Sequence, residues 1–182
     1  MFNKIEPKIV LTIDIHSHLN IPFIITDDLG NILAFTSVSK LGCSNFDIRY
    51  KCIEMMEILR NNYPFDTIIM EENQLFIDKI DRYPDPYVLR NIVMGFGIKT
   101  SIEDKYYYAV QNIIELPERE WRNKVLNAAV KYSIDLYKAH IENRGLASDV
   151  MKVISENNFY KAVCLSESVL YSGLMNKKYK IN

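Results

Sequence analysis

The stretch IVLTIDIHSH, Ile9 to His18, decides the fold because it sets one carboxylate at the end of a long apolar run. The run from Ile9 to Ile13 is rich in β-branched side chains, which is typical of a strand buried on both faces. Asp14 follows this run directly. Because a buried carboxylate is costly unless a partner compensates its charge, two interpretations are open. Either Asp14 ends the strand at solvent, or it is a metal ligand.

The composition indicates an ordinary globular protein. The chain has 182 residues, of which 48% are hydrophobic and 25% are charged, as in typical globular domains. This length suits one domain, so we expect residues 1–182 to form a single domain whose last few residues are disordered. No apolar run is long enough to span a bilayer, and no signal peptide opens the chain. We therefore expect no membrane partner.

The cysteines and histidines do not suggest a zinc site. Cys43, Cys52 and Cys164 have no C-x-x-C spacing, and an odd, widely spaced set favours free thiols in a reducing compartment. We therefore expect an intracellular protein, in the cytoplasm of a bacterium or host cell. His16 and His18 lie two apart, as in a strand-borne metal pair, but no third soft ligand accompanies them.

Charge is distributed unevenly along the chain. Residues 1–116 hold 11 Lys and Arg against 16 Asp and Glu, a net charge of −5, whereas residues 117–182 hold 11 against 7, a net charge of +4. A basic C-terminal third could contact phosphate or could be a solvated helical surface. The candidate DNA-binding residues are Arg119, Trp121, Arg122 and Lys124, although a tryptophan early in an amphipathic helix is more often part of the core.

Hydrophobic periodicity predicts alternating strands and helices. Apolar runs separated by turn residues predict a three-stranded meander, and a further strand ends at Glu71 and Glu72. Asn45 is a plausible N-cap for the first helix, and Gly95 and Gly97 suggest close packing of the second helix against a neighbour. The predicted strands are 9–15, 22–26, 32–38, 65–73 and 106–116, and the predicted helices are 45–63, 86–106, 118–143, 147–154 and 158–174.

This order of elements places two acidic strand ends together. A hairpin meander followed by strand–helix units builds a mixed sheet covered by helices. In such a sheet the first strand lies beside the strand of Glu71, so Asp14 and Glu71 are neighbours. Two adjacent buried carboxylates are tolerable with a divalent cation between them, and Mg²⁺ prefers oxygen ligands. A pair of such ions can hydrolyse a phosphodiester, which is the active-site logic of ribonuclease-H-like enzymes.

The sequence resembles the RuvC-like Holliday junction resolvases, particularly those of phages. The resemblance covers most of the chain and implies a ribonuclease-H-like α/β fold with a mixed five-stranded sheet flanked by helices. It also implies that Asp14 and Glu71 are the first two catalytic acids. It rests on TIDIHS, DTIIMEEN, LRNIVMGFGI, VQNIIELPEREWR and KAVCLSESVLYSG.

The family's last two acids, three residues apart at the start of the final helix, align with Asn158 and Lys161. Asn158 can offer a neutral oxygen to a metal, but a protonated Lys161 cannot ligate one. Three nearby acids could substitute, namely Glu156, Asp149 and Glu167. Glu156, expected in the loop before that helix, is the best placed, whereas Glu167 fits poorly because it lies six residues after Lys161. The alternative is that Lys161 pairs with Asp14 and Glu71 and stands where a cation would otherwise lie.

The resemblance implies a Mg²⁺-dependent endonuclease, with Mn²⁺ as an alternative metal, that resolves branched DNA as a homodimer. Asp14 would bridge both metals, and Glu71 would bind one. The alternative is a depleted protein that binds branched DNA or a protein partner without cleaving. An actin-like or sugar-kinase ATPase would need a Gly-rich phosphate loop after the first strand, which DIHSHLN lacks. An exonuclease with Asp-x-Glu on that strand would need glutamate in place of His16.

Overall fold

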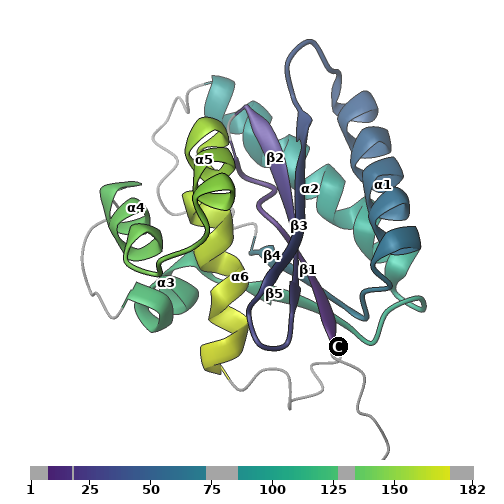
Figure 1. Ribbon diagram of the computed structural model, residues 1–182. Helices are drawn as coiled ribbons and strands as arrows, with labels where there is room; N and C mark the ends of the chain where they lie inside the picture. Colours follow the sequence, from purple (N-terminus) through teal and green to yellow (C-terminus); the bar gives the residue numbers. More distant parts are fainter. Residues whose placement is uncertain (1–7, 18, 73–85, 127–133, 173–182) are drawn as a thin grey trace, which may run out of the picture.

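The computed structural model describes residues 8–17, 19–72, 86–126 and 134–172, and these form a five-stranded mixed sheet between two layers of helices (Figure 1). The strand order is β3-β2-β1-β4-β5. β1 pairs antiparallel with β2 and parallel with β4, and the other two pairings are β2–β3 antiparallel and β4–β5 parallel. The strands are β1 (Ile9–Ile13), β2 (Asn20–Asp27), β3 (Ile32–Ser39), β4 (Thr67–Glu71) and β5 (Asn112–Leu116).

The predicted meander and ribonuclease-H-like sheet are confirmed. β2 and β3 are joined by a turn in which the Asp27 carboxylate accepts the main-chain N–H groups of Leu29 and Asn31 at 2.9 and 2.8 Å. Gly30 has φ of 81°, a left-handed conformation that glycine adopts without steric cost. The parallel β1–β4 pairing sets Ile13 opposite Met70, so the carboxyl ends of both strands reach the same edge of the sheet.

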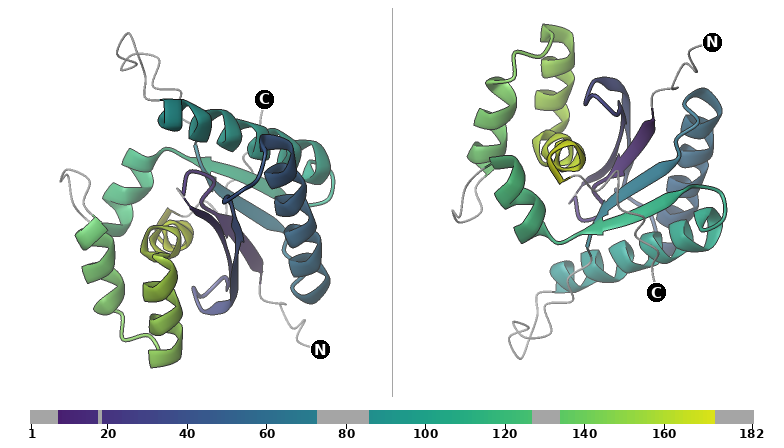
Figure 2. Two further views of the ribbon diagram at one scale, coloured as in Figure 1. Left: turned by 90° about the horizontal axis from the view of Figure 1, so that it is seen from above. Right: turned by 90° about the horizontal axis from the view of Figure 1, so that it is seen from below.

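The helices cover opposite faces of the sheet, as the end-on views show (Figure 2). The first face carries α1 (Asn45–Asn62) and α2 (Pro86–Tyr106). The second carries α3 (Glu118–Leu126), α4 (Ile134–Glu142), α5 (Ser148–Asn157) and α6 (Tyr160–Ser172). Leu11 and Ile13 belong to the core under α1 and α2, whereas Val10 belongs to the core under α3–α6. Because side chains alternate along a strand, Asp14 is directed to the α6 face.

Local capping chemistry determines where α1 begins. Ser44, not the predicted Asn45, is the N-cap. Its hydroxyl accepts the N–H of Asp47 at 3.1 Å, and the Asp47 carboxylate accepts the N–H of Ser44 at 3.0 Å. This reciprocal capping box satisfies two donors that a helix start otherwise leaves unpaired.

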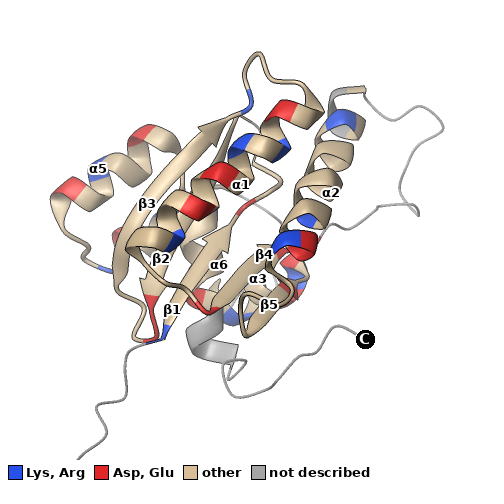
Figure 3. Ribbon diagram, turned by 90° about the vertical axis from the view of Figure 1, so that its right-hand side faces the viewer, with Lys and Arg blue, Asp and Glu red and all other residues tan. Residues whose placement is uncertain are grey.

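The outer surfaces of α1 and α2 differ in charge. Acidic and basic residues alternate along α1, while the middle of α2 carries few charged residues (Figure 3). Close packing at the two glycines of α2 is confirmed: a Cβ at Gly95 would lie 3.2 Å from the His16 ring, and one at Gly97 would lie 2.9 Å from Arg49 Cδ. The helix therefore approaches both the β1–β2 loop and α1.

Several boundaries differ from the sequence prediction. The strand predicted over residues 106–116 begins only at Asn112. Tyr106 is buried in the last turn of α2, whereas Tyr107 and Tyr108 are 54% and 95% exposed and precede the strand in a turn. Because Tyr107 and Tyr108 are exposed in a turn, this aromatic segment does not form the buried strand that the sequence predicted.

In the C-terminal part, two helices, α3 and α4, are described within the predicted long helix 118–143, and residues 127–133 between them lie outside the described residues. The predicted disordered tail also lies outside them. The three cysteines are free and buried, as predicted. Among the described helices, none is long and apolar enough to cross a membrane. The single domain over residues 1–182 and the intracellular location stay predictions.

The two glycines of α2 should respond differently to alanine. Gly97→Ala should leave the free energy of unfolding unchanged or raise it by up to about 1 kcal/mol, because alanine favours helix and the Arg49 side chain can move aside. Gly95→Ala should lower it, because the added methyl presses on the His16 ring and the Ile15 carbonyl. Urea denaturation of both variants checks this, and the reverse order of stabilities would contradict the packing described.

Candidate functional site

Asp14 and Glu71 lie next to each other at the carboxyl ends of the two central parallel strands. Glu71 is the last residue of β4, and Asp14 directly follows β1. Continuing the Ile13–Met70 register by one residue brings the two acids opposite each other on the α6 face. They are 3% and 6% exposed respectively. Two carboxylates are therefore buried side by side, and their charge needs a partner.

The partner is Lys161 in the first turn of α6. Its Nζ lies 2.8 Å from Glu71 Oε2 and 3.8 Å from Asp14 Oδ1, and its side chain is 20% exposed. The shorter contact is a close ion pair between the ammonium and the carboxylate. The ammonium thus contacts both acids, which is the arrangement expected if lysine takes the place of a cation.

The turn between α5 and α6 aims Lys161 at the sheet. Asn158 caps α5 in a left-handed conformation, with φ of 56° and ψ of 44°, which asparagine tolerates better than most residues. Phe159 and Tyr160 are then buried at the start of α6. Asn158 itself is exposed, so the structure does not bring this predicted ligand to the two carboxylates.

Asp14, Glu71 and Lys161 form an ion triad. The pKa values of Glu71 and Lys161 depend on burial and on the charges of the other members. Burial raises the pKa of Glu71 to about 7, although the Lys161 ammonium lowers it, and the Asp14 carboxylate raises it further. Burial lowers the pKa of Lys161, but the two carboxylates raise it by more, so the net shift is upward. Lys161 is therefore charged over the whole physiological pH range.

Two further basic side chains surround Asp14. The Asp14 carboxylate accepts the main-chain N–H of His16 at 3.2 Å. Burial lowers the pKa of the His16 ring to about 4, against the opposing charge of Asp14, so the ring is neutral at pH 7. Lys40 is 7% exposed, and its Nζ donates to the main-chain carbonyls of Ile15 and Ser17 at 3.3 and 2.5 Å. Burial lowers its pKa as well.

A second polar group lies beside the triad, on α3 and α4. Glu118 starts α3, and its Oε1 accepts from the Tyr137 hydroxyl at 3.3 Å and lies 3.5 Å from Arg122 NH1. Its charge contributes to the raised pKa values of both Glu71 and Lys161. The sequence analysis missed Glu118, although its position after the strand that pairs with β4 could have indicated the same sheet edge. Tyr137 gave no such signal.

The predicted DNA-binding residues divide into exposed and buried ones. Arg119 and Lys124 are exposed on α3, and Arg122 is partly buried against Glu118. Trp121 is fully buried, with its ring stacked on Tyr137 at a centroid distance of 5.7 Å. The tryptophan is therefore part of the core, and its ring is not accessible for stacking on a base.

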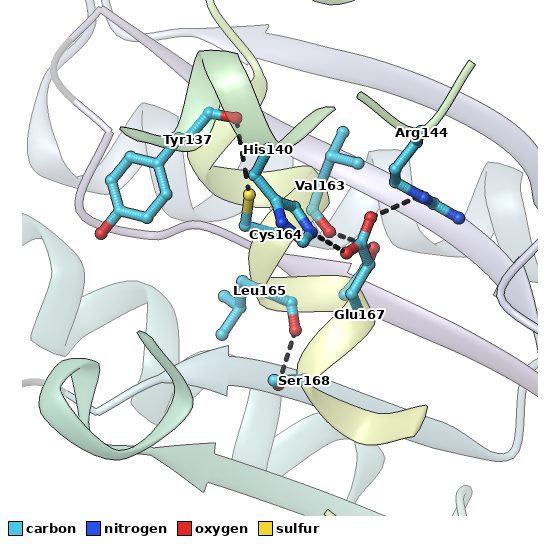
Figure 4. Close-up of polar contacts among 9 residues, drawn as sticks. Tyr137, His140, Arg144, Val163, Cys164, Leu165, Glu167 and Ser168 are labelled. Carbon is cyan, nitrogen blue, oxygen red and sulfur yellow. Dashed lines mark hydrogen bonds and ion pairs between the residues drawn. The ribbon is translucent and has the colours of Figure 1, made fainter. Parts of the chain in front are cut away.

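Glu156 does not reach the carboxylate pair. It lies in the last turn of α5, not in a loop as predicted, and it is exposed, with its Oε1 3.8 Å from Lys152 Nζ. Glu167 is also paired with other residues. This 3% exposed acid joins α6 to the α4 region, because His140 Nε2 lies 2.7 Å from its Oε2 and Arg144 pairs with its Oε1 (Figure 4).

The residues present do not fit a pair of magnesium ions. Asp14 and Glu71 supply two carboxylates, but the third group at the site is an ammonium, which has no lone pair to donate and repels a cation. Nowhere among the described residues do three or more His, Cys, Asp or Glu side chains gather in a way that could hold a metal. The Mg²⁺ or Mn²⁺ expected from the resemblance thus lacks a matching ligand set at this site.

The His16 ring should make stability depend on pH. Its pKa is lower in the folded chain than the ordinary 6.5, so the unfolded chain binds a proton first as the pH falls. The contribution of His16 to stability should therefore be lost between about pH 6.5 and pH 4, by about 2 kcal/mol from pH 7 to pH 5, while the raised pKa of Glu71 acts in the opposite direction over this range. Chemical denaturation of the wild type and of His16→Gln at both pH values separates the two contributions. On going from pH 7 to pH 5, the free energy of unfolding of the wild type should change less favourably than that of His16→Gln by about 2 kcal/mol, and an equal change in both proteins would contradict the assignment.

Comparison with known proteins shows a fold likeness without sequence similarity. The sequence matches no protein-family model and no curated protein. The structure is similar to Thermus thermophilus RuvC in complex with a Holliday junction substrate, with a TM-score of 0.59 at 9% identity, covering 92% of this chain and 96% of that one. The same enzyme in a second structure gives a TM-score of 0.58 at the same identity and coverage.

A eukaryotic resolvase shares the architecture. The yeast mitochondrial Holliday junction resolvase Ydc2 gives a TM-score of 0.54 at 15% identity, covering 91% of this chain and 77% of that one. This chain and RuvC share a five-stranded sheet in the order β3-β2-β1-β4-β5, covered by helices on both faces. The chain therefore has a ribonuclease-H-like fold that is structurally similar to the RuvC and Ydc2 resolvases.

Proposed function

We propose that this protein binds branched DNA of the four-way junction type as a homodimer, and that its Asp14–Glu71 site does not carry out metal-dependent cleavage. The likeness to resolvases over 92% of the chain supports DNA as the ligand. One observation carries the second part: the Lys161 ammonium contacts both carboxylates. Such a site is folded and charge-compensated without a metal.

The charge of the C-terminal third supports binding to phosphates. Residues 117–182 carry a net charge of +4, and Arg119 and Lys124 are exposed on α3. This helix begins directly after β5, at the sheet edge where Asp14 and Glu71 lie. Exposed cations at this edge would neutralise backbone phosphates and release counterions, which makes binding dependent on salt.

In this proposal the polar side chains act by position and charge. Lys161 holds α6 against the ends of β1 and β4, and Lys40 holds the loop after β1 through two main-chain carbonyls. Both interactions stiffen the sheet edge that faces the DNA. A rigid edge with fixed cations favours a ligand of matching shape, because little conformational entropy is lost on binding.

A second candidate function is the metal-dependent resolvase itself. The retention of Asp14 and Glu71 favours it, because two buried carboxylates at neighbouring strand ends are costly in a protein that does not use them. In this case a divalent cation would have to displace Lys161 from the pair. This function predicts that the wild type cleaves a four-way junction in the presence of Mg²⁺ or Mn²⁺ and that Glu71→Gln abolishes the cleavage. That result would contradict the proposal that the site does not cleave DNA.

Removal of charge from the proposed contact surface tests DNA binding. Arg119→Ala with Lys124→Ala should weaken binding to a four-way junction, and the slope of log affinity against log salt should fall by about 2, because two phosphate contacts are lost. Fluorescence anisotropy with a labelled junction at several salt concentrations measures both.

The matched control is Lys8→Ala with Lys105→Ala, which removes the same charge before β1 and at the end of α2, at the opposite end of the central strands. This control should bind as the wild type does. Equal affinity of the wild type for a junction and for a linear duplex would contradict the proposed selectivity for branched DNA.

The exposed face of α1 and α2 supports the homodimer. Five of its large apolar or aromatic side chains are exposed, and the middle of α2 has few charges (Figure 3). A second copy of the chain is the fitting partner, because a two-fold axis would match the symmetry of a four-way junction. The side chains, with their exposed fractions, are Phe46 (69%), Tyr50 (64%), Leu89 (44%), Val93 (51%) and Phe96 (53%).

Charged substitutions on this face test the dimer. Val93→Glu with Phe96→Glu should convert a dimer into a monomer, because like charges and unpaired polar groups would face each other across the two-fold axis. Analytical ultracentrifugation measures the mass. Tyr108→Glu, at an aromatic residue outside this face that is even more exposed, at 95%, should leave the mass unchanged. A wild-type protein that is monomeric at all concentrations would rule out the dimer.

A further inference from the structure

We propose that the Lys161 ammonium is a built-in cation that replaces a divalent metal at the Asp14–Glu71 pair, so that removing this one charge creates a metal site. The inference deepens the proposed function, since it concerns the same site. Its test uses the protein alone, without DNA. The site chemistry and the DNA binding can therefore fail separately.

The geometry is that of a cation shared by two acids. Lys161 Nζ lies 2.8 Å from one carboxylate and 3.8 Å from the other. The β1–β4 register brings these carboxylates together independently of α6. The position between them would thus be electrostatically favourable for any cation, and the lysine supplies one from the protein itself.

Among the residues that the structure describes, no other basic side chain takes over this role. Lys40 is directed to the carbonyls of Ile15 and Ser17, and Arg122 pairs with Glu118. Among the ion pairs of the described residues, those that involve Asp14 and Glu71 are both made with Lys161. Its loss would leave two buried carboxylates without a direct charge partner, which costs several kcal/mol by analogy with other broken buried pairs.

The ammonium is held in place by the packing of α6. Ala162, Val163, Cys164 and Leu165 are all buried against the sheet or the neighbouring helices. Further along the helix, Glu167 pairs with His140 and Arg144 (Figure 4). The helix therefore cannot shift to withdraw the ammonium without breaking these contacts. A metal ion would have to compete with a charge that is permanently present.

Shortening the side chain changes the site from closed to open. Lys161→Ala removes the charge and the four-carbon stem, so that water and a divalent cation can reach both carboxylates. Lys161→Met removes the charge but keeps most of the stem, and so separates the two effects. Lys161→Asp adds a third oxygen ligand from the first turn of α6, which suits a hard cation that binds oxygen.

The experiment measures Mn²⁺ binding by isothermal titration and the midpoint of thermal unfolding with Mn²⁺ or with EDTA. We expect no site-specific binding to the wild type, no Mn²⁺-dependent rise of its midpoint, and the same for Lys152→Ala, a control on α5. Lys161→Ala should have a lower midpoint in EDTA, and Mn²⁺ should raise it, because a ligand that binds only the folded state stabilises it. Lys161→Asp should bind at least about tenfold more tightly than Lys161→Ala, because it adds a third oxygen ligand.

Glu71→Gln in the Lys161→Ala background should abolish the Mn²⁺ response, which localises it to the pair. Lys161→Met should be destabilised with a weaker response to Mn²⁺. If Lys161→Ala folds only when Mn²⁺ is present, the inference is supported. Wild-type binding of Mn²⁺ that Glu71→Gln removes would overturn it, as would the absence of a Mn²⁺ response in both Lys161→Ala and Lys161→Asp. Neither result depends on whether the protein binds a junction.

Discussion

The ion pairing of Lys161 with Glu71 and Asp14 is the constraint on which the arrangement of this molecule depends. It connects the first turn of α6 to the ends of the two central strands. Buried charges in proteins are tolerated when they are paired, and here three of them meet beside the apolar core under α3–α6. Because the carboxylates come from the sheet and the ammonium from a helix, the pairing fixes both the position and the direction of α6.

Contacts along the rest of α6 support the same position. The helix packs between the sheet and α3–α5 with a run of buried residues, and Glu167 ties it to the α4 region. The Trp121–Tyr137 stack fills the space between α3 and α4. The second helical layer is thus held both by apolar packing and by two separate groups of buried charges, at the start and towards the end of one helix.

The central part of the fold was predictable because it depends on short-range patterns. Apolar runs and turn residues indicated the meander and β4, and the order of elements indicated that Asp14 and Glu71 end neighbouring strands. The site beyond these acids depends on how distant segments pack. The contacts of Lys40 and Glu118, and the exposure of Asn158, follow from loops and helix ends. The resemblance placed Lys161 near the acids, but Glu156 was misjudged because α5 extends three residues beyond its predicted end at Ile154.

The left-handed cap at Asn158 has a consequence for the evolution of this site. The resemblance to resolvases implies an acid at this position, but the residue is exposed at the end of α5, so an aspartate there would face solvent. A lineage that exchanged Lys161 for an acid would therefore regain one ligand, and the second would require remodelling of the α5–α6 turn. Without a bound metal, each intermediate along that route would carry uncompensated buried charge. Replacement of the lysine is therefore a destabilising first step, which makes this residue difficult to exchange.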